Sequence, residues 1–459
     1  MRGRLLFAAL FCSFLFSCND FLTEKSPNDI DAENAITNAA SAEAALTGIY
    51  SAMQHRSYYG GQFPLMGEAL SGDASTGGYS YISLDQLSAK NVTPANVLTE
   101  QLWIAVWRVV ANCNRLLVAL PNVGDLEEVR RKDIEAQART IRALAHFDAL
   151  RYFGEHWNRS SAFGVPVIQT VQTIEDIPQR ATVQATYSFI TGELEAALKL
   201  ADPNAEVRAQ FIHRWSIQAL LARACLYAGD RNKAAQYAAA VIDSGDYSLL
   251  PVEAYGTLFA ERRTSESIFE LAFDAQNRSD YNNLTYSRPD AVRSELFYMA
   301  AQSLDVFFKN RTNDVRSALL NFNPAENDVT IIPDGRTQKY RGEVARDNPA
   351  YIVRIAEMYL LRAEALGKTD GLSDLNALRK ARGLSERTAA DIADDAAWTE
   401  TLLDERRAEF NFEGHRYFDL ARTGRYAAVT GAEAFRAALP IPLREISASG
   451  GRLTQTPGY

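Results

Sequence analysis

The chain has 459 residues and an acidic composition, with 57 acidic against 48 basic side chains and a formal net charge of −9. Without its first eighteen residues, which contain two arginines and no acid, the net charge becomes −11. An acidic chain with no basic run offers little to a phosphate backbone, so a nucleic acid is excluded as a partner. The length is sufficient for one large domain or two closely packed ones.

The amino terminus has the order of a secretory signal. Arg2 and Arg4 precede the apolar run 5–16, and positive charge followed by an apolar segment is typical of such signals. The run is too short to cross the roughly 30 Å hydrocarbon core of a bilayer as a helix. We expect no other stretch of the sequence to be long and apolar enough to span a membrane.

The signal ends in Leu15-Phe16-Ser17-Cys18, which has the form of a bacterial lipobox with a small residue directly before the cysteine. The thiol would carry a diacylglycerol thioether, and several acyl chains on one residue give stable anchoring. The alternative is an ordinary cleaved signal with an incidental cysteine. We predict a signal at residues 1–17, lipid attachment at Cys18 and a polar tether at residues 19–32.

Two cysteines remain after the signal. Cys113 and Cys225 both lie in apolar stretches of helical period. Two thiols cannot form a disulfide framework or a zinc site. We therefore expect both to be small core residues. We predict no metal ligands among the site residues and no cofactor, and leave open whether a structural metal ion is present.

Helical periodicity dominates the chain from Ala42 onward. One apolar face begins at Val106 and stops at Pro121, a second runs from Ile134 to Gly154, and a third lies over 187–198. Further helices are predicted at 214–229, 233–244, 352–367, 372–382 and 398–422.

An internal repeat links two pairs of these predicted helices. Residues 220–224 (LLARA) lead to Gly229 and a second helix, and residues 359–365 (YLLRAEA) lead to Gly367 and a second helix. Small residues at the helix crossing, an aromatic residue and a glycine turn are typical of tetratricopeptide pairs. Such pairs must stack, because neither helix can bury its apolar face alone.

Two stretches lack this period. Residues 55–96 are rich in Gly, Ser and Tyr, and residues 250–348 mix short runs of strand type with long loops. The alternation in 267–273 predicts a strand. Loops of this length in a compact domain are usually functional.

The charged segment 405–419 allows two interpretations. Glu405 and Glu409 lie one helical turn apart with His415 nearby, as in an acid–base site. The interleaved Arg406 and Arg407, however, would lower the carboxyl pKa values, whereas a general acid needs a raised pKa. We therefore predict a structural ion-pair network and no catalytic residues. A hydrolase remains the alternative, since glycosidases need only two carboxylates that a sequence cannot pair.

A binding surface is predicted in the two stretches without helical period. A sugar ring needs a flat aromatic side chain to stack on and nearby amide or charged groups for its hydroxyls. Phe63 and Tyr298, by contrast, lie in apolar surroundings and are expected in the core. The alternative for each tyrosine is that it packs its loop onto the helices. The predicted ligand-binding residues are Tyr58, Asp73, Tyr79, Tyr81, Tyr281, Asn283, Tyr286 and Arg288.

The chain resembles the SusD/RagB lipoproteins of Bacteroidetes, from Cys18 to its last residue. The most specific motifs are the helix at 354–365, the paired segments 405–410 and 413–420, and the ending, with LPIP at 439–442, EI at 445–446 and PGY at 457–459. The asparagine expected before Leu453 is missing, because Ser449-Gly450-Gly451-Arg452 stands there instead.

The resemblance implies an all-α dominated fold, with tetratricopeptide-like pairs as a scaffold, long loops and a few short strands. One domain would cover residues 33–459, with an N-terminal part at 33–250 and a C-terminal part at 251–459. The resemblance further implies a lipoprotein facing outward on the outer membrane, which passes an oligosaccharide or a peptide to a TonB-dependent, SusC-like transporter without catalysis. The alternatives are a peptide-binding member of the family and a surface-anchored hydrolase.

Overall fold

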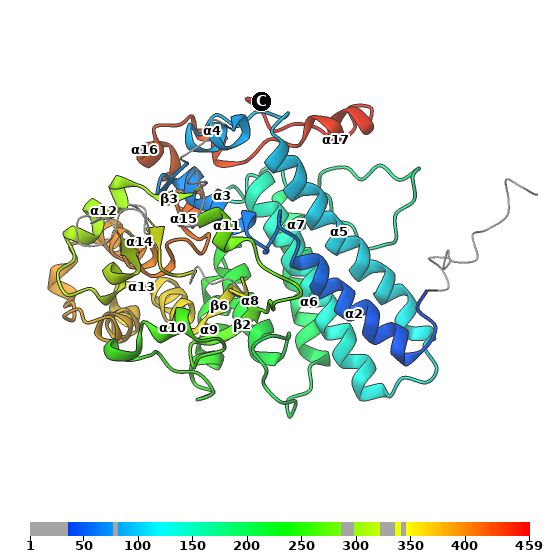
Figure 1. The fold of residues 1–459 in the computed structure, drawn as a ribbon, viewed down its shortest axis with the longest axis horizontal. Helices are drawn as coiled ribbons and strands as arrows, with labels where there is room; N and C mark the ends of the chain where they lie inside the picture. Colours follow the sequence, from blue (N-terminus) through cyan, green and yellow to red (C-terminus); the bar gives the residue numbers. More distant parts are fainter. Residues whose placement is uncertain (1–34, 77–80, 286–297, 322–335, 341–345) are drawn as a thin grey trace, which may run out of the picture.

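A computed structural model describes residues 35–76, 81–285, 298–321, 336–340 and 346–459. The predicted signal, Cys18 and the tether lie outside these residues. Figure 1 shows a helix-rich body, which confirms the predicted fold class.

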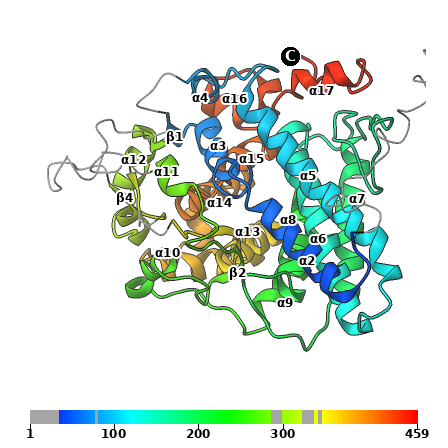
Figure 2. The same ribbon diagram turned by 45° about the vertical axis from the view of Figure 1, so that its right-hand side comes forward.

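A row of helices forms the scaffold. Neighbours in the row pack against one another in chain order, and α13 continues the row by packing on α9 and on α14. The row is seen at two angles in Figures 1 and 2. Its members are α2 (Ala39–Met53), α5 (Val97–Ala119), α6 (Glu128–Phe153), α7 (Val183–Leu200), α8 (Arg214–Tyr227), α9 (Arg231–Ile242), α13 (Ile355–Ala381) and α14 (Asp395–Phe410).

The helix ends follow from local chemistry. The side chain of Asn96 accepts hydrogen bonds from the backbone N–H groups of Leu98 and Thr99 and thereby caps α5. Pro121 lies in the 3-10 turn η2 (Leu120–Asn122) that ends this helix. Gly154 terminates α6, and the Thr182 side chain caps α7. The predicted positions of these helices are confirmed.

Both tetratricopeptide-like pairs are present. Gly229 joins α8 to α9 with φ 81°, and Gly367 joins the two halves of α13 with φ 79°. Glycine fits these turns because other residues rarely adopt this left-handed conformation. Within the second pair, a Cβ on Gly371 would lie 2.2 Å from the carbonyl oxygen of Ala363. The two halves of α13 therefore cross in close contact.

The composition of α5 corrects one expectation. Val97–Asn122, which includes η2, is long and apolar enough to cross a membrane by length and composition. In the folded chain, however, α5 packs against α2 and α6, and Val106, Val109 and Cys113 on it are buried. Cys225 on α8 is buried as well, so Cys113 and Cys225, the free cysteines of the described residues, are core residues as predicted.

The stretch 55–96 is not free of helix. It contains α3 (Gln62–Ser71) and α4 (Ile82–Ser88). All ten residues of α3 are buried, and a helix buried on every side has no polar face, so its sequence shows no amphipathic period. This explains why α3 was not predicted.

The predicted helix at 398–422 is interrupted. It forms α14 and α15 (Arg416–Arg422), separated by a turn in which Phe412 and Gly414 have positive φ values of 62° and 80°. A Cβ on Gly414 would lie 2.6 Å from the Cα atom of Pro64 in α3. The turn therefore admits α3, which packs against α15 near the centre of Figure 2.

The strands form three antiparallel two-stranded sheets among the described residues. They are β1 (Ala74–Ser75) with β3 (Met299–Ala300), β2 (Ser267–Leu271) with β6 (Ala350–Arg354), and β4 (Leu320–Asn321) with β5 (Arg336–Thr337). The strand predicted at 267–273 is confirmed as β2. The remaining short elements are η3 (Val252–Ala254), α10 (Thr257–Ala260), α11 (Tyr281–Thr285), α12 (Gln302–Lys309), η4 (Val315–Leu319), η6 (Ala389–Asp391), α16 (Tyr426–Thr430), η7 (Ala434–Ala437) and α17 (Leu443–Ala448).

Candidate functional site

The two stretches predicted to carry the ligand site lie together. The backbone N–H of Asp280 donates to the Gly60 carbonyl at 2.7 Å, and the Tyr281 hydroxyl donates to the Tyr59 carbonyl at 2.7 Å. Strand β1, from the first stretch, pairs with β3, from the second. The described residues of the two stretches therefore meet on one surface. We call the surface around β1, β3 and α11 the β1–β3 face.

Two of the predicted stacking tyrosines are core residues. Tyr58 and Tyr281 are both 0% exposed. The Tyr58 hydroxyl donates to Asp148 Oδ2 at 2.5 Å, and the Tyr281 ring stacks on Tyr340 with centroids 4.1 Å apart. The prediction of ligand contact is corrected for both, because their rings are already covered by protein. Here the alternative interpretation, that tyrosines pack the loops onto the helices, is the right one.

Asp73 also needs a correction. Its carboxylate is buried and accepts a forked pair of hydrogen bonds from Arg407 of α14, with Nη2 to Oδ1 at 2.5 Å and Nε to Oδ1 at 3.0 Å. This ion pair ties the β1–β3 face to α14, so the carboxylate is not free for a ligand. Phe63 and Tyr298 are buried, as predicted.

Two predicted residues remain at the surface. Tyr81 precedes α4 and is 40% exposed. Asn283 is half-buried on α11, and its amide donates to Asp280 Oδ1 at 2.6 Å. The other three, Tyr79, Tyr286 and Arg288, lie outside the described residues, in segments that adjoin β1 and α11 in sequence.

The predicted ion-pair network around 405–419 is confirmed, but its partners differ from the predicted ones. Arg406 and Arg407 pair with Asp419 and Asp73, and arginines from elsewhere in the chain hold Glu405 and Glu409. Glu409 is 0% exposed and is held by Arg316, Arg354 and Arg382. Burial raises the pKa of its carboxyl, but these guanidinium groups outweigh it and hold the pKa well below the usual range.

Two neighbours of Glu409 complete this picture. Glu405 behaves in the same way, and Arg316, Arg311 and Arg379 bring its pKa to about 2 against the effect of burial. Burial and nearby arginines hold the pKa of His415 well below its usual range, so this ring is neutral. Fixed, ionised and buried carboxylates lack both the raised pKa and the substrate access of a general acid.

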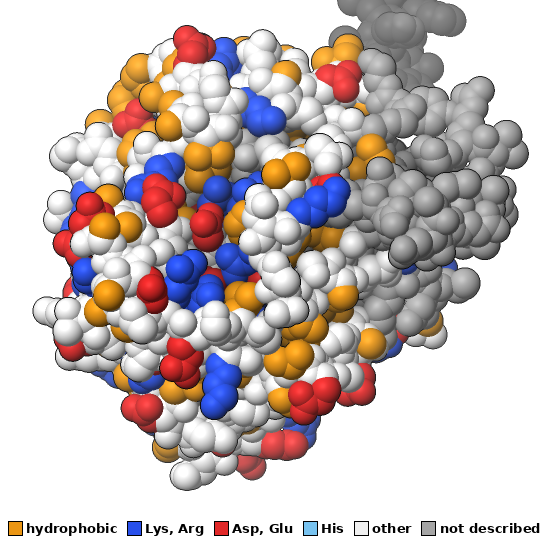
Figure 3. All heavy atoms as spheres, turned by 90° about the vertical axis from the view of Figure 1, so that its left-hand side faces the viewer, with side chains coloured by type: hydrophobic (Ala, Val, Ile, Leu, Met, Phe, Trp, Pro, Cys, Tyr) orange, Lys and Arg blue, Asp and Glu red, His pale blue; other side chains and the backbone are white. Residues whose placement is uncertain are grey.

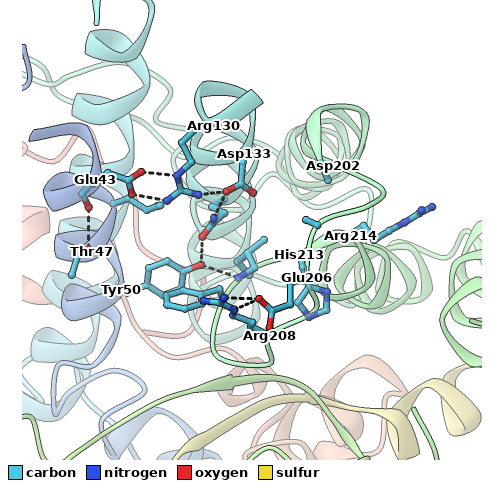
Figure 4. A pocket seen from close by; sticks show the side chains of 16 residues that line it. Glu43, Thr47, Tyr50, Arg130, Asp133, Asp202, Glu206, Arg208, His213 and Arg214 are labelled. Carbon is cyan, nitrogen blue, oxygen red and sulfur yellow. Dashed lines mark hydrogen bonds and ion pairs between the residues drawn. The ribbon is translucent and has the colours of Figure 1, made fainter. Parts of the chain in front are cut away.

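The sequence did not predict a cavity of about 420 Å³ between α2, α6 and the segment 201–214 that joins α7 to α8. We call it the α2–α6 cavity (Figure 4). Arg130 bridges two carboxylates on its wall, with Nε to Glu43 Oε1 at 2.6 Å and a second bond to Asp133. The Tyr50 hydroxyl donates to Gln137 Oε1 at 2.6 Å and lies below this group in the figure.

The electrostatics of the cavity are mixed. The Arg130 guanidinium lowers the pKa of Glu43, whereas burial raises the pKa of Asp133. Burial lowers the pKa of His213 to about 4, so its ring is neutral. The lining residues come from three separate segments. No local motif marks them, and only the exposed Phe211 in a polar linker could have drawn attention to the place.

The outer surface carries no large field of one sign on the side drawn in Figure 3. Basic and acidic side chains are interspersed there, with small apolar patches between them. Such a surface favours an uncharged ligand or partner over a strongly charged one.

Comparisons with known proteins match most of the chain to SusD-like proteins. Residues 321–437 match a family described as the SusD family, and residues 20–226 match one described as starch-binding and associating with the outer membrane. SusD-like protein P2 of Formosa agariphila is 25% identical, with 97% of each chain covered.

Solved structures give the same result. A SusD superfamily protein of Bacteroides vulgatus is 25% identical, with a TM-score of 0.79 over 92% of this chain and 99% of that one. A laminarin-binding SusD-like protein is 23% identical, with a TM-score of 0.78 over 92% of this chain and 100% of that one. Together with the helix pairs, the buried arginine network and the motifs at the carboxyl end, these matches show that the chain belongs to the SusD/RagB family.

Proposed function

We propose that this protein is a lipoprotein of the outer membrane that binds an oligosaccharide outside the cell and delivers it to a TonB-dependent, SusC-like transporter. The observation that carries the proposal is the match of residues 20–226 to a family described as starch-binding and associating with the outer membrane. It is supported by a structural neighbour, described as laminarin-binding, that covers 92% of this chain. The buried, ionised carboxylates of segment 405–419 support binding without hydrolysis.

The β1–β3 face is the proposed ligand surface. It carries Tyr81 as an exposed aromatic ring and Asn283 as a partly exposed amide. These are the groups that a sugar needs for stacking and for hydrogen bonds to its hydroxyls. The predicted ligand residues Tyr79, Tyr286 and Arg288 follow or precede described parts of this face in sequence. A shallow surface desolvates only part of a ligand, so we expect a Kd in the micromolar range or weaker.

Calorimetric titration with laminarin oligosaccharides, starch oligosaccharides and peptides tests this surface. Tyr81→Ala should weaken oligosaccharide binding by about tenfold, equivalent to about 1.4 kcal/mol, because it removes a stacking surface. Tyr79→Ala and Tyr286→Ala are predicted to act in the same direction. Tyr237→Ala, on the partly buried face of α9, serves as the control and should bind like the wild type.

Three results would contradict parts of this proposal. If all three tyrosine variants bind as the wild type does, the ligand surface lies elsewhere. If only peptides bind, the peptide-binding branch of the family is the better comparison. If the protein releases new reducing ends from the bound glycan, it is a hydrolase.

The anchor has its own test. Cys18→Ala removes the only thiol that could carry the lipid in the lipobox, so the mature chain should move from the membrane fraction to the soluble fraction. Cys113→Ala, a change at a buried core thiol, should leave the protein on the membrane. Proteinase treatment of intact cells should remove the wild-type protein, since it is expected to face outward. A Cys18→Ala variant that stays with the membrane would disprove the anchor.

A further inference from the structure

We propose that the α2–α6 cavity is a second saccharide site, distinct from the β1–β3 face and suited to a short, uncharged oligosaccharide or the end of a longer one. The inference rests on the proposed function for the class of ligand. The position and chemistry of the site come from the cavity itself.

An aromatic ring is presented at this cavity in a fixed position. Phe211 is 42% exposed, although large aromatic side chains are usually covered. Its ring packs edge-on against Tyr50 with centroids 5.6 Å apart. The Tyr50 hydroxyl is held in turn, because it accepts a hydrogen bond from the Ile212 N–H at 2.8 Å and donates one to Gln137. The exposed face of Phe211 is therefore a platform that loses little mobility when a ring stacks on it.

The polar wall of the cavity is fixed in the same way. Arg130 binds both carboxylate oxygens of Glu43, at 2.6 and 2.5 Å, and also binds Asp133. Gln137 donates to Asp133 Oδ2 at 2.9 Å. Within the described residues, no hydrogen bond reaches the second oxygen of Asp133, so Oδ1 is free to accept one from a hydroxyl. Sugar hydroxyls both donate and accept, and this wall offers carboxylate oxygens and guanidinium N–H groups side by side.

The charge and size of the cavity restrict the ligand. Four carboxylates line the cavity together with Arg130, Arg208 and Arg214, and Arg214 points away from the others in Figure 4. Glu43 and Asp133 pair with Arg130, and Glu206 pairs with Arg208, so of the four only Asp202 is left without one of these arginines. A wall whose charges are mostly paired gives no strong preference to an anion or a cation, so a neutral polyhydroxylated molecule fits best. The volume of about 420 Å³ lies at the small end of ligand cavities, which span roughly 300–1,000 Å³. A long chain could therefore enter only with its end.

The cavity is separate from the β1–β3 face. Its lining comes from α2, α6 and the segment 201–214, and includes no residue of β1, β3, α4 or α11. Figures 1 and 2 show the lower part of α2 and α6 on one side of the molecule, with α3, α4 and β1 toward the top. One site can therefore be changed without touching the other.

Saturation-transfer NMR on the full mature chain, with laminarin and starch oligosaccharides of two to six sugars as probes, tests the second site. Tyr81→Ala and Phe211→Ala form a matched pair, because each removes a ring of similar exposure, 40% and 42%, from a different surface. Tyr81→Ala should keep a residual saccharide signal that falls at least fivefold when Phe211→Ala is added. Phe211→Trp should retain the signal, because it keeps a stacking surface, and thermal unfolding verifies that each variant is folded.

Each outcome decides one question. A residual signal that is insensitive to Phe211→Ala and to Asp133→Asn overturns the second site and leaves the proposed function standing. A wild-type signal that is lost entirely in Phe211→Ala and unchanged in Tyr81→Ala supports the cavity and overturns the β1–β3 face. A wild-type chain that gives no saccharide signal, but binds peptides, overturns the proposed glycan function and this site with it.

Discussion

Glu409→Ala should lower the free energy of unfolding by about 3–5 kcal/mol, because it leaves buried arginines without their shared partner. The Glu409 carboxylate accepts hydrogen bonds from Arg354 Nη1 and Arg382 Nη2 on Oε1, both at 2.9 Å, and from Arg382 Nε on Oε2 at 2.9 Å. Arg316 approaches Oε2 at 3.3 Å. All of these guanidinium groups are at most 1% exposed, so water cannot replace the lost carboxylate.

Equilibrium unfolding in urea, followed by circular dichroism, measures the effect. Glu400→Ala is the matched control, because Glu400 lies on the same helix and pairs with Arg425, but its side chain is 59% exposed. An exposed pair contributes about 1 kcal/mol or less. The midpoint should therefore shift strongly for Glu409→Ala and little for Glu400→Ala. Equal shifts for both variants would show that the buried network does not stabilise the fold as argued.

The same network predicts how stability depends on acid. The folded-state pKa values of Glu405 and Glu409 lie below the value of 4.5 for a free glutamate, and that of Glu405 is about 2. A lowered carboxyl pKa contributes stability that is complete above the unfolded pKa and is lost as the pH falls through the folded pKa. The contribution of Glu405 should therefore disappear between about pH 4.5 and pH 2, and that of Glu409 should be lost in the same direction as the pH falls.

The scaffold could be predicted because its signals are local. Pro121 and Gly154 end α5 and α6, and Gly229 and Gly367 mark the turns of the helix pairs. Each acts through the backbone of its own neighbourhood, so one sequence is enough to place it. The ion-pair network was predicted from the arginines and carboxylates that alternate in 405–419. The arginines that hold Glu409, however, are Arg316, Arg354 and Arg382, which lie far away in sequence and could not be named from it.

The candidate site was harder to predict, because exposure depends on what packs against a residue from elsewhere. The sequences around Tyr58 and Tyr281 contain the aromatic, amide and charged residues that are typical of a sugar-binding loop. Asp148 of α6 and Tyr340 cover them, and both lie far away in sequence. Helix α3 was not predicted because it is buried on all sides, so its sequence has no amphipathic period.

The α2–α6 cavity could not be predicted either, because its lining residues meet only in the folded chain. Glu43, Arg130 and Phe211 lie far apart in the sequence, and none of them alone differs from an ordinary surface residue. Their juxtaposition follows from the packing of α2 along α5 and α6 and from the path of the α7–α8 linker. A binding site assembled in this way can be found only in the folded chain.

A second buried carboxyl should have the opposite dependence on pH. Glu68 of α3 is 0% exposed, and its Oε1 accepts a hydrogen bond from the Gly414 N–H at 2.9 Å. Its Oε2 has no hydrogen-bond partner within the described residues. Burial, and secondly the nearby Asp73, raises the pKa of Glu68 to about 8, although the Gly414 and Phe412 N–H groups oppose the shift.

A raised carboxyl pKa means that the folded chain holds its proton more tightly than the unfolded chain, in which the pKa is near 4.5. The free energy of unfolding should therefore fall as the pH rises from about 4.5 to about 8. Above about pH 8, Glu68 should make it change little further. Glu68→Gln replaces the carboxyl by an amide, which has nearly the same shape as the protonated carboxyl and cannot ionise. It should stabilise the protein by an amount on the order of 3 kcal/mol at pH 7, and by much less near pH 5.

Thermal unfolding of the wild type and Glu68→Gln between pH 5 and pH 9 measures this difference directly. Glu433→Gln is the control, since the Glu433 side chain is 69% exposed and its replacement should give a small difference that does not grow with pH. The gap between Glu68→Gln and the wild type should widen steadily up to about pH 8 and then level off. A Glu68→Gln variant that is less stable than the wild type at pH 8 would show that the carboxylate is ionised and paired in the folded chain. In that case the ionised Glu68 carboxylate would hold α3 to the 412–414 turn through its hydrogen bond from the Gly414 N–H. The close packing of Gly414 on Pro64 would then be a secondary contribution to this contact.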